Sequence, residues 1–186
     1  MKKLTTSQLL ANSLLELSAN KDVDKITIKE IVENCGLSSQ TFYNHFADKY
    51  ALMLWIHKSV GDELIEKLEN GEITPRELSI HNLEFYSNHT SFILNALHNT
   101  HGADSYRIKS AEDAIDVIEE FIKRKFGKSK LSMTEKQHLR LYVYGVSAIC
   151  ENWAETGAAI SLEDMSDIIM DAMPDSLKKY IRALPN

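Results

Sequence analysis

The chain has 186 residues, 44% hydrophobic and 26% charged, which excludes a disordered chain and allows a substantial core. No apolar run approaches the roughly 20 residues that a membrane span needs, and the N-terminal stretch turns polar where a secretory signal would have an apolar core. We therefore expect a cytoplasmic protein without a membrane partner. The net charge of −6 comes from residues 51–186, because residues 1–50 carry six lysines, six acids and no arginine.

Helix starts are marked along the chain by Ser or Thr followed three residues later by an acid or Gln. In this capping box each side chain bonds a free backbone N–H at the helix start. The pattern occurs at Thr5–Gln8, Thr27–Glu30, Thr74–Glu77 and Ser132–Glu135, with weaker versions at Ser110–Asp113 and Ser161–Asp164. It predicts an all-α fold with helices over 6–19, 28–34, 39–45, 49–69, 75–99, 111–126, 133–156 and 162–182.

Apolar residues of the first three helices, including Leu10, Leu14, Ile31 and Phe42, can close a small three-helix core. The helix over 49–69 would join this core to the remaining helices. We therefore expect an N-terminal domain over residues 1–50 and a larger helical domain over residues 51–186.

The second and third helices have the punctuation of a helix-turn-helix motif. Gly36 can take the left-handed conformation that ends the second helix, and Ser38 can cap the third. Phe42 and Phe46, four residues apart, would face inward. The third helix would then be presented outward, as in a DNA-reading helix.

The outward side chains of the third helix are almost all hydrogen-bonding, and none is acidic. The amides of Gln40 and Asn44 can pair with adenine in the major groove, and Tyr43 and His45 can reach phosphates. Lys49 adds a positive charge at the start of the next helix. Thr27 and Lys29, at the start of the second helix, are further candidates for backbone contacts.

The stretch ITIKEIVENCGLSSQTFYNHFADKYAL resembles the N-terminal domain of TetR-family regulators, chiefly through Thr41-Phe42-Tyr43-Asn44-His45-Phe46-Ala47-Asp48-Lys49. The resemblance covers about the first 55 residues. It implies that residues of the third helix lie near bases, namely Ser39, Gln40, Thr41 and Asn44. It implies contacts to the DNA backbone by Thr27, Tyr43, His45 and Lys49. Cys35 departs from the family, which more often has Ala there.

A narrower resemblance, to regulators of dihydroxyacetone-kinase operons, runs through residues 40–55 and includes Gly145, Trp153 and Gly157. In that subgroup the effector can be a partner protein and the regulator can activate transcription. The resemblance therefore leaves a small molecule and a protein as alternative effectors.

The last two predicted helices each have an apolar stripe that suits a homodimer interface, although such stripes can also fill the core of a monomer. In TetR-like proteins the last two long helices usually pair with those of a second copy. The candidate interface residues are Leu139, Val143, Val146, Cys150, Ile168, Ile169 and Met173.

An effector pocket would lie among the middle helices and be lined by aromatic side chains, although aromatic residues at helical spacing more often belong to a core. The candidates are Phe85, Tyr86, Phe92, Phe121, Tyr142 and Trp153.

No phosphate-binding loop, nucleophile elbow or metal-binding motif occurs, so we expect neither an enzyme nor a cofactor. The histidines at 81, 89, 98 and 101 lack the spacing of a compact metal site. The sequence thus favours a dimeric regulator, acting as a repressor, that binds palindromic double-stranded DNA. The alternatives are an activator controlled by a partner protein, and a helical adaptor that has lost DNA binding.

Overall fold

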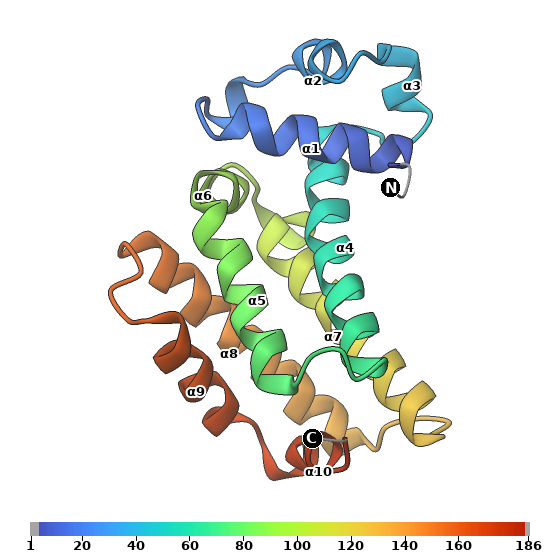
Figure 1. Cartoon of the computed structure of the whole chain (residues 1–186), viewed down its shortest axis with the longest axis vertical. Coiled ribbons are helices and arrows are strands. Elements are labelled where there is room, and N and C mark those ends of the chain that lie inside the picture. The colour runs from blue at the N-terminus through green and yellow to red at the C-terminus, as the bar shows by residue number, and fades with distance from the viewer. Residues whose placement is uncertain (1–3, 185–186) are drawn as a thin grey trace. The chain divides into compact units, whose positions relative to one another are not determined.

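The computed structural model describes residues 4–184, and this range contains α-helices, two short 3₁₀ helices and no strand (Figure 1). The predicted all-α fold is thus confirmed. In chain order the elements are α1 Thr6–Ser18, η1 Val23–Lys25, α2 Ile28–Asn34, α3 Ser39–Tyr43, α4 Lys49–Glu69, α5 Pro75–Asn88, α6 Thr90–His98, η2 Gly102–Asp104, α7 Tyr106–Phe126, α8 Met133–Glu155, α9 Leu162–Ala172 and α10 Asp175–Arg182. Among the described residues, no helix is both long and apolar enough to cross a membrane.

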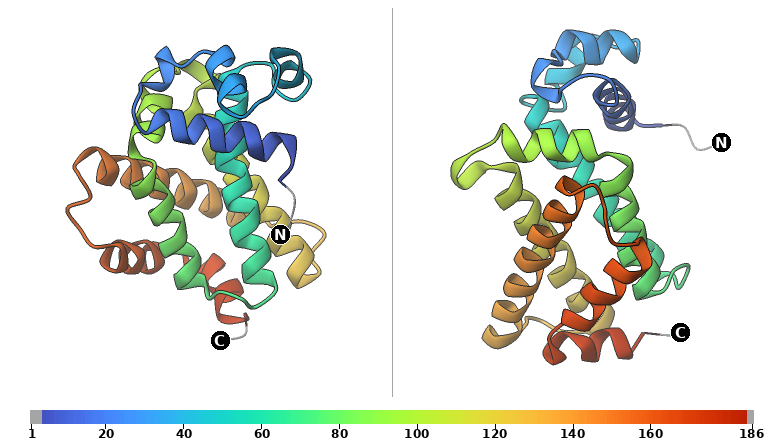
Figure 2. Two further views of the ribbon diagram at one scale, coloured as in Figure 1. Left: turned by 45° about the horizontal axis from the view of Figure 1, so that its top comes forward. Right: turned by 90° about the vertical axis from the view of Figure 1, so that its left-hand side faces the viewer.

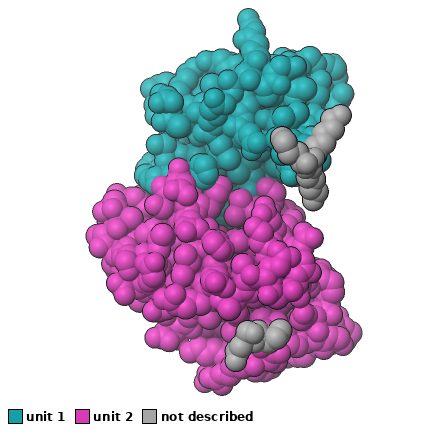
Figure 3. All heavy atoms as spheres, viewed as in Figure 1, with its two compact units in different colours: residues 1–57, 89–109 teal, residues 58–88, 110–186 magenta. Residues whose placement is uncertain are grey.

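The chain divides into two compact units, coloured separately in Figure 3. The first unit comprises residues 1–57 and 89–109, and the second comprises residues 58–88 and 110–186. The first unit therefore extends beyond the proposed N-terminal domain over residues 1–50, because it also contains residues 51–57 and residues 89–109, which include α6. This helix joins the unit because it packs against α1 and η1.

The core of the first unit is built from the apolar faces that the sequence indicated. Leu10, Leu14, Ile31 and Phe42 are fully buried. A buried hydrogen bond of 2.7 Å from the Ser13 hydroxyl to the carbonyl of Ile31 ties α1 to α2. Because this bond satisfies a polar group inside the core, it fixes the position of the helix pair rather than weakening the core.

In the second unit α5 packs along α9, and α10 packs against α8. Figure 2 shows the pairing of α5 with α9 from two further sides. The buried residues of this unit come mainly from α7, α8 and α10, and include Ile115, Phe121, Leu139, Val143, Leu177 and Tyr180. Burial of these apolar side chains supplies the main stabilising free energy of the unit.

All four strong capping boxes are confirmed. Thr5, Thr27 and Ser132 each make both reciprocal hydrogen bonds. At the start of α5, the amide of Thr74 donates to Glu77 at 2.7 Å and the amide of Glu77 donates to the Thr74 hydroxyl at 3.2 Å. Of the two weaker signals, Ser161 caps α9, whereas the start predicted at residues 110–113 is wrong. That segment lies inside α7, which begins at Tyr106.

Two predicted long helices are each divided in the structure. The helix expected over 75–99 breaks at His89, whose backbone leaves the helical region. The break lets Leu83 and Tyr86 of α5 join the second unit while Phe92 joins the first. The helix expected over 162–182 breaks before Pro174, because the residue before a proline is forced towards extended backbone and proline has no N–H to donate.

Candidate nucleic-acid interface

The turn between α2 and α3 has the predicted conformation. Gly36 has a φ of +69°, in the left-handed region that favours glycine. The amide of Leu37 donates to the carbonyl of Val32 at 2.8 Å, which closes the C-terminus of α2. The chain therefore reverses within four residues and brings the start of α3 beside the end of α2.

The α3 helix begins at a cap and is anchored by two phenylalanines. The Ser38 hydroxyl accepts from the amide of Thr41 at 3.1 Å. Phe42 is fully buried and Phe46 nearly so, with their ring centroids 5.9 Å apart. The helix ends at Tyr43, two residues earlier than predicted, because Asn44 forms its C-cap. The inward orientation of both rings is confirmed.

The remaining side chains of α3 and the two residues after it form an outward surface, which we call the α3 surface. Ser39, Gln40, Tyr43, Asn44 and His45 are exposed, and Thr41 is half-buried. The Gln40 amide nitrogen donates to the Asn44 amide oxygen at 3.0 Å. The His45 ring nitrogen lies 3.5 Å from the Ser7 hydroxyl. The α3 surface therefore brings together most of the predicted DNA contacts, and it carries no acid.

The start of α2 holds Thr27 in internal hydrogen bonds. Its backbone N–H and its hydroxyl both donate to the Glu30 carboxylate at 2.9 Å, and the hydroxyl also accepts from the amide of Glu30. The hydrogen bond from Lys21, followed by those from Thr27, lowers the pKa of Glu30 to about 2. Lys29 points to solvent and makes only a loose ion pair with Glu33, at 3.8 Å. Of the two predicted phosphate contacts here, Lys29 is therefore the more available.

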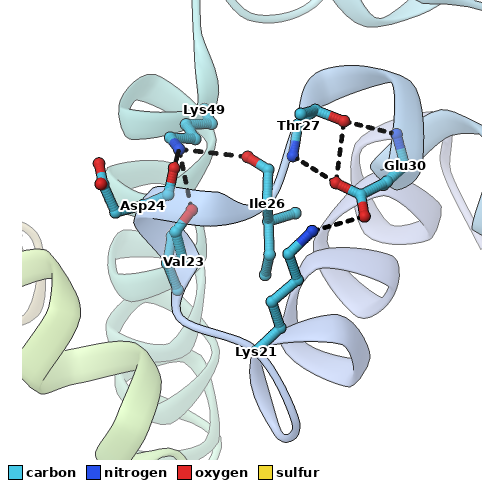
Figure 4. Close-up of polar contacts among 7 residues, drawn as sticks. All are labelled: Lys21, Val23, Asp24, Ile26, Thr27, Glu30 and Lys49. Atoms are coloured by element: carbon cyan, nitrogen blue, oxygen red, sulfur yellow. Dashed lines mark hydrogen bonds and ion pairs between the residues drawn. The ribbon is translucent and has the colours of Figure 1, made fainter.

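Lys49 is turned into the domain rather than towards solvent (Figure 4). Its ammonium donates to the carbonyls of Val23 at 2.8 Å, Asp24 at 2.7 Å and Ile26 at 3.1 Å. Partial burial lowers its pKa, although the nearby Asp24 carboxylate opposes that change. A charged side chain predicted from the sequence to reach DNA is thus committed to backbone acceptors of its own domain.

The aromatic residues predicted to line a pocket divide between the two units. Phe92 belongs to the first unit, whereas the other five belong to the second. Of those five, only Tyr142 is not buried, and its hydroxyl donates to the carbonyl of Ile169 at 3.0 Å. A cleft of about 420 Å³ in the second unit is lined instead by Lys58, Asp62, Ile65, Glu66, Glu69, Asp116, Val117, Glu120 and Arg124.

The predicted dimer-interface residues divide by exposure. Four of them are buried within the chain itself, namely Leu139, Val143, Cys150 and Ile169. Val146 and Met173 are half-buried, and Ile168 is exposed. The apolar stripe chosen from the sequence is therefore mostly the face of α8 that fills the second unit.

Sequence reasoning missed a second apolar face on α8. Leu141 is 72% exposed and Ile149 is 44% exposed, with Gly145 and Ala148 exposed between them. Together with Ile168 of α9, we call these residues the α8–α9 surface. Their spacing of four and then three or four residues was the available signal, since it places them on one side of a helix.

Comparison with known proteins supports the interpretation of the first unit. Residues 13–56 match the family model for bacterial regulatory proteins of the tetR family. The transcriptional activator DhaS of the dhaKLM operon, from Lactococcus lactis subsp. lactis (strain IL1403), is 28% identical over 64 residues. That alignment spans about a third of each protein, 34% of both lengths.

Solved structures resemble the chain over nearly its whole length. The dihydroxyacetone kinase operon activator DhaS gives a TM-score of 0.63 at 19% identity, covering 99% of this chain and 100% of that one. The TetR-family repressor FadR of Thermus thermophilus, in complex with lauroyl-CoA, also gives 0.63, at 18% identity and with 90% and 92% covered. These relatives are transcriptional regulators rather than enzymes. Residues 13–56 thus match the N-terminal domain of the tetR family, and the whole chain has the fold of solved TetR-family regulators.

Proposed function

We propose that the chain represses transcription by binding a palindromic operator in double-stranded DNA as a homodimer, until an effector acts on its second unit. The observation that carries this proposal is the α3 surface. Its hydrogen-bonding side chains can match base edges in DNA, and it carries no acidic side chain. The buried rings of Phe42 and Phe46 anchor the helix to the core beneath it. Side chains held on a packed helix can read a sequence without first being ordered.

A second copy of this chain is the proposed occupant of the α8–α9 surface. Leu141 and Ile149 offer apolar area to a partner, and Gly145 and Ala148 between them allow the backbones of two helices to approach closely. A two-fold dimer also suits a palindromic operator. Its two copies of α3 must reach two half-sites that lie about one turn of DNA apart.

The effector would act by favouring one of two arrangements of the dimer. Its binding free energy must differ between the arrangement that fits the operator and the one that does not. The α4 helix is suited to transmit this difference, since its residues 49–57 belong to the first unit and its residues 58–69 to the second. The proposal leaves the effector as a small molecule or a protein.

The experiment that tests the proposal is a selection of random duplex DNA on the purified full-length protein, with Tyr43→Ala as the control. Tyr43 is 56% exposed on the α3 surface and its side chain lies outside the core, so this variant should fold normally. Enrichment of an inverted repeat by the wild type, and not by the variant, is the expected result. Recovery of no sequence at low salt would contradict the proposal.

A second candidate function is activation under the control of a partner protein. It is favoured by the likeness to DhaS, an operon activator that matches in sequence over 64 residues and in fold over 99% of the chain. Transcription in vitro from a promoter that carries the selected repeat separates the two candidates. A repressor lowers the transcript level when added alone, whereas an activator that a partner protein controls leaves the level unchanged or raises it.

A further inference from the structure

The three hydrogen bonds of the Lys49 ammonium use all the donors that it has. A lysine ammonium carries three N–H groups, and here each points to a separate backbone carbonyl at 2.7–3.1 Å (Figure 4). To reach a DNA phosphate directly, the side chain would have to break at least one of these bonds. The geometry therefore argues against the phosphate contact that the sequence resemblance implied.

The three carbonyls belong to one short connection, η1 and the residue after it. Val23 and Ile26 of this connection are buried, and α6 and α1 pack against η1 within the same unit. Ile26 directly precedes Thr27, the N-cap of α2, whose hydrogen bonds reach Glu30 and through it Lys21. Lys49 itself is the first residue of α4.

We propose that Lys49 is a positioning residue for DNA recognition, which ties the first turn of α4 to the η1 connection and so fixes both neighbours of α3. The inference rests on the proposed DNA-binding function. In sequence α3 lies between α2 and α4. Hydrogen bonds between the start of α4 and the residues before α2 therefore fix the relative positions of the two helices that flank the α3 surface.

Lys49→Met removes the donors while keeping a long apolar stem. The carbonyls in the partly buried connection then lose their charged partner, and the connection can shift to regain hydrogen bonds. Three readouts separate a positioning residue from the alternatives: affinity for the inverted repeat recovered by selection, affinity for a duplex of scrambled sequence, and the dependence of each on salt. All are measured on full-length protein well below its unfolding temperature.

Two matched variants calibrate these readouts. Lys29→Met removes an exposed lysine beside the same motif, and it should weaken both duplexes and reduce the salt slope by about 0.9 if that lysine touches a phosphate. Glu135→Gln removes the charge of a buried carboxylate in the second unit, so it should lower the unfolding midpoint without changing either affinity. Lys49→Met should instead weaken the inverted repeat by about tenfold or more, with the scrambled duplex and the salt slope unchanged.

Two outcomes would overturn the inference. If Lys49→Met weakens both duplexes and lowers the salt slope as expected for a phosphate contact, Lys49 is a phosphate ligand. If it lowers only the unfolding midpoint, its role is merely structural.

If the wild type binds neither duplex, the proposed DNA-binding function itself has failed. A separate measurement then tests the contact between Lys49 and the η1 connection. Amide hydrogen exchange then reports on η1 directly, where Lys25 and Ile26 donate to backbone carbonyls at 2.9 and 3.1 Å. Faster exchange at these two amides in Lys49→Met supports the tie, and unchanged exchange refutes it.

Discussion

At the residue scale, Gln40 and Asn44 present one bonded pair of amides rather than two separate ones. Because the Gln40 nitrogen donates to the Asn44 oxygen, the Gln40 oxygen and the Asn44 nitrogen remain as an acceptor and a donor. Adenine offers the complementary donor and acceptor in the major groove. The two side chains can therefore read a single base together.

This pairing makes the effects of Gln40→Ala and Asn44→Ala non-additive. We expect each single variant to relax preference at the same base pair by about 1–3 kcal/mol, and the double variant to add little more. Binding measurements on repeats changed one base pair at a time provide the test. Tyr43→Ala, as a control for phosphate contact, should weaken every sequence alike. Additive losses at two different base pairs would show that the amides read DNA independently.

The turn before α3 depends on the backbone freedom of Gly36. Its φ of +69° is unfavourable for any residue with a Cβ, although no atom beyond its two chain neighbours lies within 4 Å of where that Cβ would be. We expect Gly36→Ala to lower the free energy of unfolding by about 1 kcal/mol, measured by urea denaturation.

The matched control for this turn is Gly61→Ala, within α4. It also meets open space but has no positive φ, so alanine should raise the free energy of unfolding by up to about 1 kcal/mol. Opposite signs for the two variants isolate the cost of the left-handed backbone. A stabilising Gly36→Ala would show that the turn can adopt another conformation.

At the scale of elements, the start of α8 is joined to α10 through the buried carboxylate of Glu135. This residue completes the capping box with Ser132 and also accepts from Lys128 at 3.1 Å, from Lys179 at 2.7 Å and from the Tyr180 hydroxyl. Burial alone would raise the pKa of Glu135, but the hydrogen bonds from Lys179, Tyr180 and Ser132 outweigh it and hold the pKa far below its usual range.

We expect Glu135→Gln to lower the free energy of unfolding by about 2 kcal/mol at neutral pH, as for hydrogen bonds to a charged group. Since the pKa of the folded state is depressed, the stabilisation by the carboxylate is present above the ordinary glutamate pKa and is lost as pH falls below it. Urea denaturation between neutral and acid pH should therefore show wild type and variant converging. Glu163→Gln, on the exposed first turn of α9, is the control. A constant difference across that range would exclude the carboxylate as the cause.

Local chemistry explains why the starts of elements were predictable while some ends were not. A cap such as Thr27 with Glu30 needs only residues three apart, and therefore it is visible in the sequence. The break at His89 has no such signal, because it arises from α5 and α6 packing into different units. Pro174 is a signal for a break. The helical spacing of apolar residues continues on both sides of it, however, and this spacing favoured a single unbroken helix.

The candidate site was predictable to a similar extent. The α3 surface follows from the period of Phe42 and Phe46, since the residues between inward rings must face outward. The position of the Lys49 ammonium does not follow, because its acceptors lie 23 to 26 residues earlier in the chain. Whether a lysine points to solvent or bonds to its own domain is decided by the tertiary structure, and the local sequence does not show it.

At the scale of the whole molecule, two apolar stripes run along α8 and only one of them is used within the chain. Leu139 and Val143 face the interior of the second unit, so the stripe first favoured as an interface is occupied. Leu141 and Ile149 remain exposed on another side of the same helix. The choice between the stripes depends on which face α10 and α5 cover, and that information lies outside α8 itself.

Dimerisation through the α8–α9 surface predicts that Leu141→Asp yields a monomer. A carboxylate there would have to be desolvated against its counterpart in a two-fold interface, which opposes association. Sedimentation should show a dimer for the wild type and a monomer for the variant, and affinity for the inverted repeat should fall roughly a hundredfold or more because the two half-sites no longer bind together. Leu4→Asp, at an exposed leucine of the first unit, should leave the dimer intact. A Leu141→Asp protein that still sediments as a dimer would place the interface elsewhere, and the spacing of the two α3 surfaces would then have to follow from that other contact.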